Sequence, residues 1–351
     1  MYLMWIKTSI VRKEGGFMRK TYNYSSVFAP YIRSFIKMKQ DCGFNVMTTQ
    51  GTLYEFDQFF ITMKIKDIFI TRKLIEKWRS TRINGDTRTM YAKYSVWSQF
   101  CKYLCCHGHE CYIPRLPKPV SPDVFVPYIF SHKQINDMFQ SCDSLRMVNE
   151  RMSSILFVMP ALLRLMYGTG IRVSEALSIR NSDVDLEKRY ILIRKTKNGE
   201  QRLIPLSDTL IEVISEYITN RNRMPLPKAN YPESFLFVSP NGNCCAANRV
   251  YDWFRKILSK SGIPHLGNHK GPRVHDLRHT FAVHSLMQMV KSGYDMYYSL
   301  PILSTYLGHK SVKATEQYVG LTMEVYPELL NDERKLCAYV FPKTIYENEN
   351  N

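Results

Sequence analysis

The chain has 351 residues, of which 45% are hydrophobic, which suffices for two domains with packed cores. This composition excludes a wholly disordered chain. Lysine and arginine number 48 against 31 acidic residues, so the formal net charge is +17. Such an excess favours a polyanionic partner, either a nucleic acid or an anionic membrane surface, over a basic protein with no such partner.

The sequence contains no evident membrane or targeting segment. No apolar run reaches the ~18 residues that a transmembrane helix needs, and residues 1–17 lack the small-residue cleavage site of a signal peptide. We therefore expect a cytoplasmic protein without a membrane partner. Residues 1–19 are predicted to be a disordered extension, and Met18 is an alternative to Met1 as the translation start. Residues 332–351 are predicted to be a C-terminal tail that is polar at 347–351, and the segment Val325 to Phe341 is expected to dock on a neighbouring protomer or to pack in cis.

The cysteines predict free thiols. There are nine, an odd number, and without a secretion signal they indicate a reducing compartment. Several cysteines and histidines lie between Cys101 and Cys111, but their spacing matches no zinc pattern of paired CxxC type. Cys101 and Cys105 are spaced as core residues of a helix. A structural role is therefore favoured over zinc binding, and no metal site is expected.

Residues 20–112 are predicted to form a small, basic, all-helical domain. Apolar residues recur at a helical period between residues 24 and 48, and Thr71 suits the N-cap of a helix that begins at Arg72. A further helix over 88–104 has an apolar stripe made of Met90, Tyr94, Trp97, Phe100, Cys101 and Leu104. The basic side chains that accompany these helices are Lys73, Lys77, Arg79, Arg82, Arg88 and Lys93.

A proline-rich segment follows this domain. Four prolines between residues 113 and 122 cannot continue a helix and favour an extended, semi-rigid path. The sequence therefore predicts a linker over residues 113–129. Its basic residues Arg115 and Lys118 suit a linker that runs along DNA, and they suit a merely solvated linker equally well.

The second domain is predicted over residues 130–331. Ser131 suits the N-cap of a helix through Phe139, and an apolar helix over 152–167 is broken by Gly168-Thr169-Gly170. Residues 172–179 are predicted to be helical again. Two apolar runs, 190–194 and 202–206, flank Asn198-Gly199 and predict a β-hairpin, and residues 235–238 predict a short strand. With helices afterwards, the fold class is mainly α with a small β-sheet.

One cluster of side chains suits a phosphate. His275, Arg278 and His279 are spaced to share one face of a helix. Zinc is disfavoured because the glutamate of the HExxH motif is absent. A guanidinium matches phosphate oxygens, and imidazole moves protons near neutral pH. No nucleotide cofactor is expected, because the chain has no P-loop and Gly168-Thr169-Gly170 lacks the third glycine and the preceding strand of a dinucleotide loop.

Two further residue types suit the same chemistry. Lys197 lies beside the hairpin turn, where a mobile lysine suits a general acid, and Lys195 is its rival. Tyr318 offers an oxygen nucleophile one short predicted helix after Leu307-Gly308-His309, and Tyr306 and Tyr326 are the alternatives.

Three boxes together resemble a known family. Residues 170–177 (Gly-Ile-Arg-Val-Ser-Glu-Ala-Leu), residues 275–282 (His-Asp-Leu-Arg-His-Thr-Phe-Ala) and Leu307-Gly308-His309 followed by Tyr318 are similar in order and spacing to those of the tyrosine recombinases, the phage integrase family. The resemblance covers roughly residues 20–330. It implies a helical core-binding domain followed by a mixed α/β catalytic domain, joined at the proline-rich linker.

The resemblance assigns the phosphate contacts. Arg172 and Arg278 would bind the non-bridging oxygens of the scissile phosphate, and His309 would donate a hydrogen bond to it. Glu175 would orient the Arg172 side chain without contacting the phosphate.

It also assigns the covalent chemistry. Tyr318 would attack the phosphate to give a 3′-phosphotyrosyl link, and His275 would assist removal of the tyrosine proton. Lys197 would protonate the leaving 5′-oxygen, and His279 is a supporting residue. The hairpin has an extra residue relative to shorter family versions, which leaves Lys195 as an alternative to Lys197, and residues 287–299 form a longer connection than usual.

The implied partners are double-stranded DNA and further copies of the chain, as a tetramer on paired sites, with no cofactor and no metal. The residues expected to contact DNA are Lys73, Lys77, Arg82, Arg88, Lys93, Arg115 and Lys118.

Three other functions remain open from sequence: a type IB topoisomerase, a catalytically silent DNA-binding protein, and a metal-dependent nuclease. The target site, accessory factors, and the choice among integration, excision, dimer resolution and inversion are not encoded in these boxes.

Overall fold

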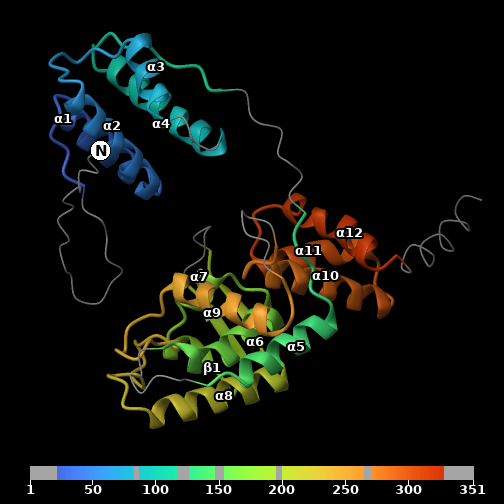
Figure 1. Cartoon of the computed structure of the whole chain (residues 1–351). Coiled ribbons are helices and arrows are strands. Elements are labelled where there is room, and N and C mark those ends of the chain that lie inside the picture. Colours follow the sequence, from blue (N-terminus) through green and yellow to red (C-terminus); the bar gives the residue numbers. More distant parts are fainter. Residues whose placement is uncertain are drawn as a thin grey trace, which may run out of the picture. The chain divides into compact units, whose positions relative to one another are not determined.

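The computed structural model describes residues 22–82, 87–117, 126–146, 154–194, 200–264 and 271–327. The chain divides into two compact units, residues 1–125 and 126–351, and Figure 1 labels their helices. This division falls inside the segment that the sequence assigns to a linker, and the finer domain boundaries remain predictions. The predicted extension at residues 1–19 and tail at 332–351 lie outside the described residues.

The described part of the first unit is helical. It contains α1 (Ala29–Asp41), α2 (Met47–Thr62), α3 (Arg72–Ser80) and α4 (Thr87–Cys105), drawn from blue to teal in Figure 1. All six residues of the apolar stripe predicted within α4 are buried. The Phe56 and Trp97 rings stack with centroids 3.9 Å apart, and Trp78 meets the Trp97 ring edge-on at 5.7 Å. An aromatic core thus holds α2, α3 and α4 together.

The start of α3 confirms the predicted cap. The Thr71 backbone is extended, and its hydroxyl oxygen accepts a hydrogen bond from the Leu74 amide at 3.1 Å. This bond satisfies one of the amides that the first helical turn leaves unpaired.

The cysteines near the end of α4 differ in burial, because Cys105 and Cys106 are exposed and Cys111 is half-buried. Cys101 is buried in the core, and the thiol of Cys105 donates to the Cys111 carbonyl oxygen. Across the described ranges, no three or more His, Cys, Asp or Glu side chains gather as metal ligands would.

The second unit joins a helical body to a small sheet. Its helices are α5 (His132–Asp143), α6 (Met159–Thr169), α7 (Val173–Ala176), α8 (Asp208–Arg223), α9 (Ala247–Lys260), α10 (Asp276–Lys291), α11 (Met296–Leu307) and α12 (Lys313–Val325), with 3-10 turns η1 (Leu156–Val158) and η2 (Asn181–Asp183). Strands β1 (Val184–Asp185), β2 (Tyr190–Ile193) and β3 (Arg202–Pro205) form an antiparallel sheet in the order β1-β2-β3. Ile191 pairs with Ile204 in the predicted hairpin.

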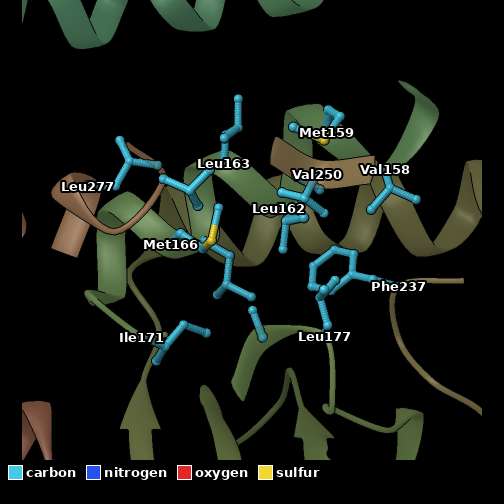
Figure 2. Close-up of a cluster of buried hydrophobic side chains, with 14 of the residues drawn as sticks. Val158, Met159, Leu162, Leu163, Met166, Ile171, Leu177, Phe237, Val250 and Leu277 are labelled. Carbon is cyan, nitrogen blue, oxygen red and sulfur yellow. The ribbon is translucent and has the colours of Figure 1, made fainter. Parts of the chain in front are cut away.

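Helix α6 lies at the centre of the core. It contacts α5, α8 and α10, and Figure 2 shows Leu162, Leu163 and Met166 among side chains of other elements, including Phe237 and Leu277. A second cluster lies where α10, α11 and α12 contact one another, seen in orange and red in Figure 1. The first cluster fixes the segment that leaves α6, and the second fixes α12. None of the described helices is both long and apolar enough to cross a membrane.

Helix boundaries differ from the sequence expectation at two places. The apolar helix expected from residue 152 begins at Met159, after η1, because Pro160 lacks an amide hydrogen and fits only the first turn of a helix. It continues through Thr169 and ends at Gly170, whose φ of 62° is the left-handed conformation that glycine adopts without strain. The helix expected over 172–179 is only the single turn of α7.

Ser131 caps α5 as predicted. Its hydroxyl accepts from the Gln134 amide while the Gln134 side chain accepts from the Ser131 amide, and the helix extends past Phe139 to Asp143. The prediction of a strand over residues 235–238 is wrong. Phe235 and Val238 make isolated bridges to two different segments, at Arg180 and Cys244, so no ladder forms. The third strand of the sheet is instead β1, which the sequence did not predict because a strand of two residues is too short to show an alternating pattern.

The Thr71 cap generates a stability prediction. Thr71→Ala removes the hydroxyl acceptor and is expected to lower the free energy of unfolding by about 1 kcal/mol, whereas Thr71→Ser keeps the acceptor and is expected to retain most of it. Urea denaturation monitored by tryptophan fluorescence measures the difference, because Trp78 lies on the capped helix. Equal losses in the two variants would mean that the hydroxyl does not cap α3.

Candidate active site

A left-handed turn delivers Arg172 to the site. Gly170 has Phe281 so close that a Cβ atom would lie 2.4 Å from a ring carbon, which favours glycine independently of its backbone angle. Two residues later the Arg172 amide donates to Glu175 Oε2 at 3.0 Å, and its Nη1 donates to Glu175 Oε1 at 2.8 Å. The arginine is thus bound to its own helical turn at both backbone and guanidinium.

Glu175 is ionised although it is buried. Its side chain is 1% exposed, and it accepts hydrogen bonds from two arginines, Arg172 and Arg202. Burial opposes ionisation, but the hydrogen bonds from Arg202 and Arg172 outweigh it and hold the pKa of Glu175 below its usual range. The supporting role predicted for Glu175 thus has a geometric basis in its contact with Arg172.

Arg278 connects the segments that precede Arg172 and His309. Its side chain emerges from the first turn of α10 and is buried; Nη1 donates to the Gly170 carbonyl oxygen at 2.9 Å and Nη2 to the Leu307 carbonyl oxygen at 2.7 Å. Burial, and then the charge of Arg172, lower the pKa of Arg278 to about 10, so the guanidinium stays charged at neutral pH. A guanidinium has five N–H groups, so donors remain for an anion.

The tyrosine lies against an imidazole. Tyr318 projects from α12 and is buried, and its Oη is 3.0 Å from Nδ1 of His279. The His309 ring is nearly parallel to the Tyr318 ring with centroids 6.4 Å apart, and His309 Nδ1 lies 2.8 Å from Thr315 Oγ1. The His275 ring meets the His279 ring edge-on at 4.9 Å.

The three imidazoles are neutral near pH 7. Desolvation, and after it the neighbouring positive charges, lower the pKa of His275 and of His309 to about 4. Desolvation and the nearby His275 lower the pKa of His279 to about 3. Each neutral imidazole therefore has one nitrogen that accepts a hydrogen bond and one N–H that donates, and its low pKa makes it a weak base in the free protein.

Tyr318 experiences two opposing effects. Burial raises the pKa of its hydroxyl, while the charges of Arg278 and Arg172 lower it. The raised pKa is the net result, so the phenol is protonated in the free protein. Deprotonation of Tyr318 therefore needs an acceptor, and the imidazole within hydrogen-bond distance is His279.

Most of the predicted catalytic residues come together. Arg172 and Arg278 lie near enough to His275, His309 and Tyr318 for their charges to lower the pKa of all three. Lys197 and its rival Lys195 lie outside the described residues.

The predicted DNA contacts that the structure describes fall into two groups. Lys73, Lys77, Arg88 and Arg115 are exposed. Arg82 and Lys93 both pair with Glu55, at 2.6 and 2.7 Å, so part of their charge is already neutralised. Lys118 lies outside the described residues.

Sequence reasoning missed Arg202 and Thr315. Arg202 had a signal: along β3 it shares a face with the buried Ile204 while Leu203 points to solvent, so alternation places the arginine on the inner face. Thr315 had none, because a threonine that binds an imidazole looks like any other helical threonine in sequence.

The sequence is similar to that of known recombinases. The model of the phage integrase family matches residues 129–324. Tyrosine recombinase XerC of Bacillus subtilis is 26% identical over 323 residues, covering 88% of this chain and 95% of XerC. The integrase/recombinase y4rB of Sinorhizobium fredii is 26% identical over 307 residues, covering 87% of this chain and 96% of that protein.

Solved structures share the fold. The XerH recombinase bound to difH in a pre-cleavage complex has a TM-score of 0.59 at 19% identity, covering 83% of this chain and 81% of XerH. A lambda integrase dimer bound to a COC′ core site has a TM-score of 0.57 at 17% identity, covering 82% of this chain and 76% of the integrase.

These matches identify the class. The family model covers more than half of the chain, so the chain belongs to the phage integrase family. Within it, the chain is a tyrosine site-specific recombinase, as its XerC relatives are, which confirms the family resemblance expected from sequence. The solved structures share its fold and confirm the expected fold class.

The neutral imidazoles predict acid lability. In the unfolded chain a histidine titrates near its ordinary value of 6.5, while the folded values are about 4 for His275 and about 3 for His279. Below that ordinary value the unfolded state binds more protons, so the free energy of unfolding falls as the pH drops from about 6.5 toward 4. We expect a lower melting temperature at about pH 5 than at about pH 7.5.

His279→Gln supplies the control, because it removes one of these titrations. The difference in melting temperature between the two pH values should shrink in this variant. Equal melting temperatures of the parent chain at both pH values would contradict the lowered pKa values.

Proposed function

We propose that Tyr318 cuts DNA by attacking a backbone phosphate, and that the chain rejoins strands through the resulting 3′-phosphotyrosyl link without metal or ATP. The observation that supports this most is the burial of the Tyr318 hydroxyl beside Arg278 with His279 at 3.0 Å. A phenol with a raised pKa needs both a proton acceptor and nearby positive charge before it attacks an anion.

Arg172 and Arg278 supply that charge. A phosphodiester repels an incoming nucleophile, and two guanidiniums fixed by Glu175 and by backbone carbonyls offset the repulsion without reorganising during the reaction. When Nδ1 of His309 accepts from the Thr315 hydroxyl, its Nε2–H is the donor to the phosphate. Each such donor is worth about 10²–10³ in rate.

The proton and bond changes balance within the site. The Tyr318 oxygen forms a bond to phosphorus while the bond from phosphorus to the 5′-oxygen breaks. The phenolic proton passes to a neutral imidazole, His279 by contact or His275 next to it, and Lys197 donates a proton to the leaving oxygen. Rejoining reverses these steps when a 5′-hydroxyl attacks the link, so no external energy source is needed.

The partner is double-stranded DNA, bound by a chain of net charge +17. The exposed cations of α3 and the linker residue Arg115 suit phosphate contacts. A solved lambda integrase tetramer bound to a Holliday junction, with a TM-score of 0.56 to this chain, supports a tetramer on paired sites. A DNA-bound enzyme of this kind works in the cytoplasm.

Covalent trapping tests this function. Tyr318→Phe should retain DNA binding and lose the SDS-stable DNA–protein adduct, because only the oxygen nucleophile is removed. The substrate is duplex DNA from the flanks of the gene, nicked near the exchange point to trap the adduct. Tyr306→Phe and Tyr326→Phe are the matched controls and should retain the adduct, and EDTA should leave it intact.

An adduct that persists in Tyr318→Phe would refute the assignment of the nucleophile. Loss of activity in EDTA would indicate a metal-dependent nuclease. Relaxation of supercoiled DNA without recombination between two sites would indicate a topoisomerase.

A further inference from the structure

Arg202, the first residue of β3, hydrogen-bonds the carboxylate that also binds Arg172. It belongs to none of the three sequence boxes. Its Nη2 donates to Glu175 Oε2 at 2.8 Å, its Nη1 to Glu175 Oε1 at 3.3 Å, and its Nε to the Tyr306 carbonyl oxygen at 3.0 Å. One side chain thereby contacts two segments more than a hundred residues apart in sequence.

Both carboxylate oxygens of Glu175 accept hydrogen bonds from Arg172 and from Arg202. Oε1 of Glu175 accepts from Nη1 of Arg172 and from Arg202, and Oε2 accepts from the Arg172 amide and from Arg202. Because the carboxylate is buried, it has no water to replace a lost partner. The orientation of Arg172 therefore depends on a carboxylate whose two oxygens also accept hydrogen bonds from Arg202.

The second contact concerns His309. Tyr306 and Leu307 end α11, and Gly308 turns the chain with a φ of 67° just before His309. A Cβ atom on Gly308 would lie 3.0 Å from Nη1 of Arg202, so the turn and the guanidinium are packed against each other. The position of the turn that presents His309 is thus tied to the same arginine.

We propose that Arg202 is a positioning residue for strand cleavage. It holds the Arg172–Glu175 pair and the Tyr306–Gly308 turn in one frame, so that Arg172 and His309 meet the same phosphate. Arg278 joins the same two parts of the chain through its hydrogen bonds to the Gly170 and Leu307 carbonyl oxygens. Arg202 acts through shape rather than charge alone, because its fork fits the two carboxylate oxygens and the carbonyl oxygen simultaneously.

The test compares substitutions that separate shape from charge. Arg202→Lys keeps the charge and loses the fork, and Arg202→Met keeps an apolar stem of similar length. We expect the single-turnover cleavage rate at saturating DNA to fall by about 10- to 100-fold in both variants, as small misplacements of catalytic groups do. The Kd for DNA should change by less than about threefold, since no phosphate contact is lost.

Arg180→Lys is the matched control. Arg180 also pairs with a carboxylate, that of Glu233, but lies outside the site, so this variant should cleave at the parent rate. A parent-like rate in Arg202→Lys would show that charge alone matters and would overturn the proposal. A raised Kd with an unchanged rate at saturation would assign Arg202 to direct DNA contact and would overturn it equally.

A double-mutant cycle tests the route through Glu175. If Arg202 acts through that carboxylate, the combined loss in Arg202→Lys with Glu175→Gln should fall well short of the product of the single losses. A product of the two would mean that they act independently. This inference rests on the proposed cleavage activity, and the outcomes are distinguishable: a parent chain without adduct defeats that activity, whereas equal rates in parent and Arg202→Lys defeat only the role of Arg202.

Discussion

The site depends on one buried guanidinium, that of Arg278. Its two bonds to the Gly170 and Leu307 carbonyl oxygens connect the end of α6 to the end of α11, and these are the segments that lead into Arg172 and His309. A charge removed from water is costly unless its hydrogen bonds are satisfied. The same bonds that stabilise Arg278 therefore join the two segments, and the Arg278 side chain also hydrogen-bonds the Tyr318 hydroxyl.

The other electrostatic features follow from this concentration of positive charge. Arg172 and Arg202 share the buried Glu175, so one negative charge offsets part of the repulsion. The charges of Arg278 and Arg172 add to the desolvation that keeps His275 and His309 neutral, and they oppose the burial that keeps Tyr318 protonated. The site thus combines charged guanidiniums, neutral imidazoles and a protonated phenol, which are the groups that the proposed cleavage of a phosphodiester requires.

The sequence predicted what local patterns encode. The α4 stripe, the Thr71 and Ser131 caps and the β2–β3 hairpin arise from neighbours in the chain, and the structure contains each of them. The predicted start of α6 at residue 152 was wrong. A helix accepts a proline such as Pro160 only in its first turn, and the sequence pattern does not show which turn that is. Of the site, the boxes named Arg172, Arg278, His309 and Tyr318, but the bonds that orient them join segments far apart. Arg202 to Tyr306 and His279 to Tyr318 are such pairs, and no spacing within one segment reveals them.

The most direct measurement of the central claim is the identity of the residue bound to DNA. The covalent complex of the parent chain is digested with nuclease and protease, and mass spectrometry locates the nucleotide. The account predicts a nucleotide that is linked through its 3′-phosphate to the phenolic oxygen of Tyr318. A nucleotide on Tyr306, on Tyr326 or on any other residue would contradict it.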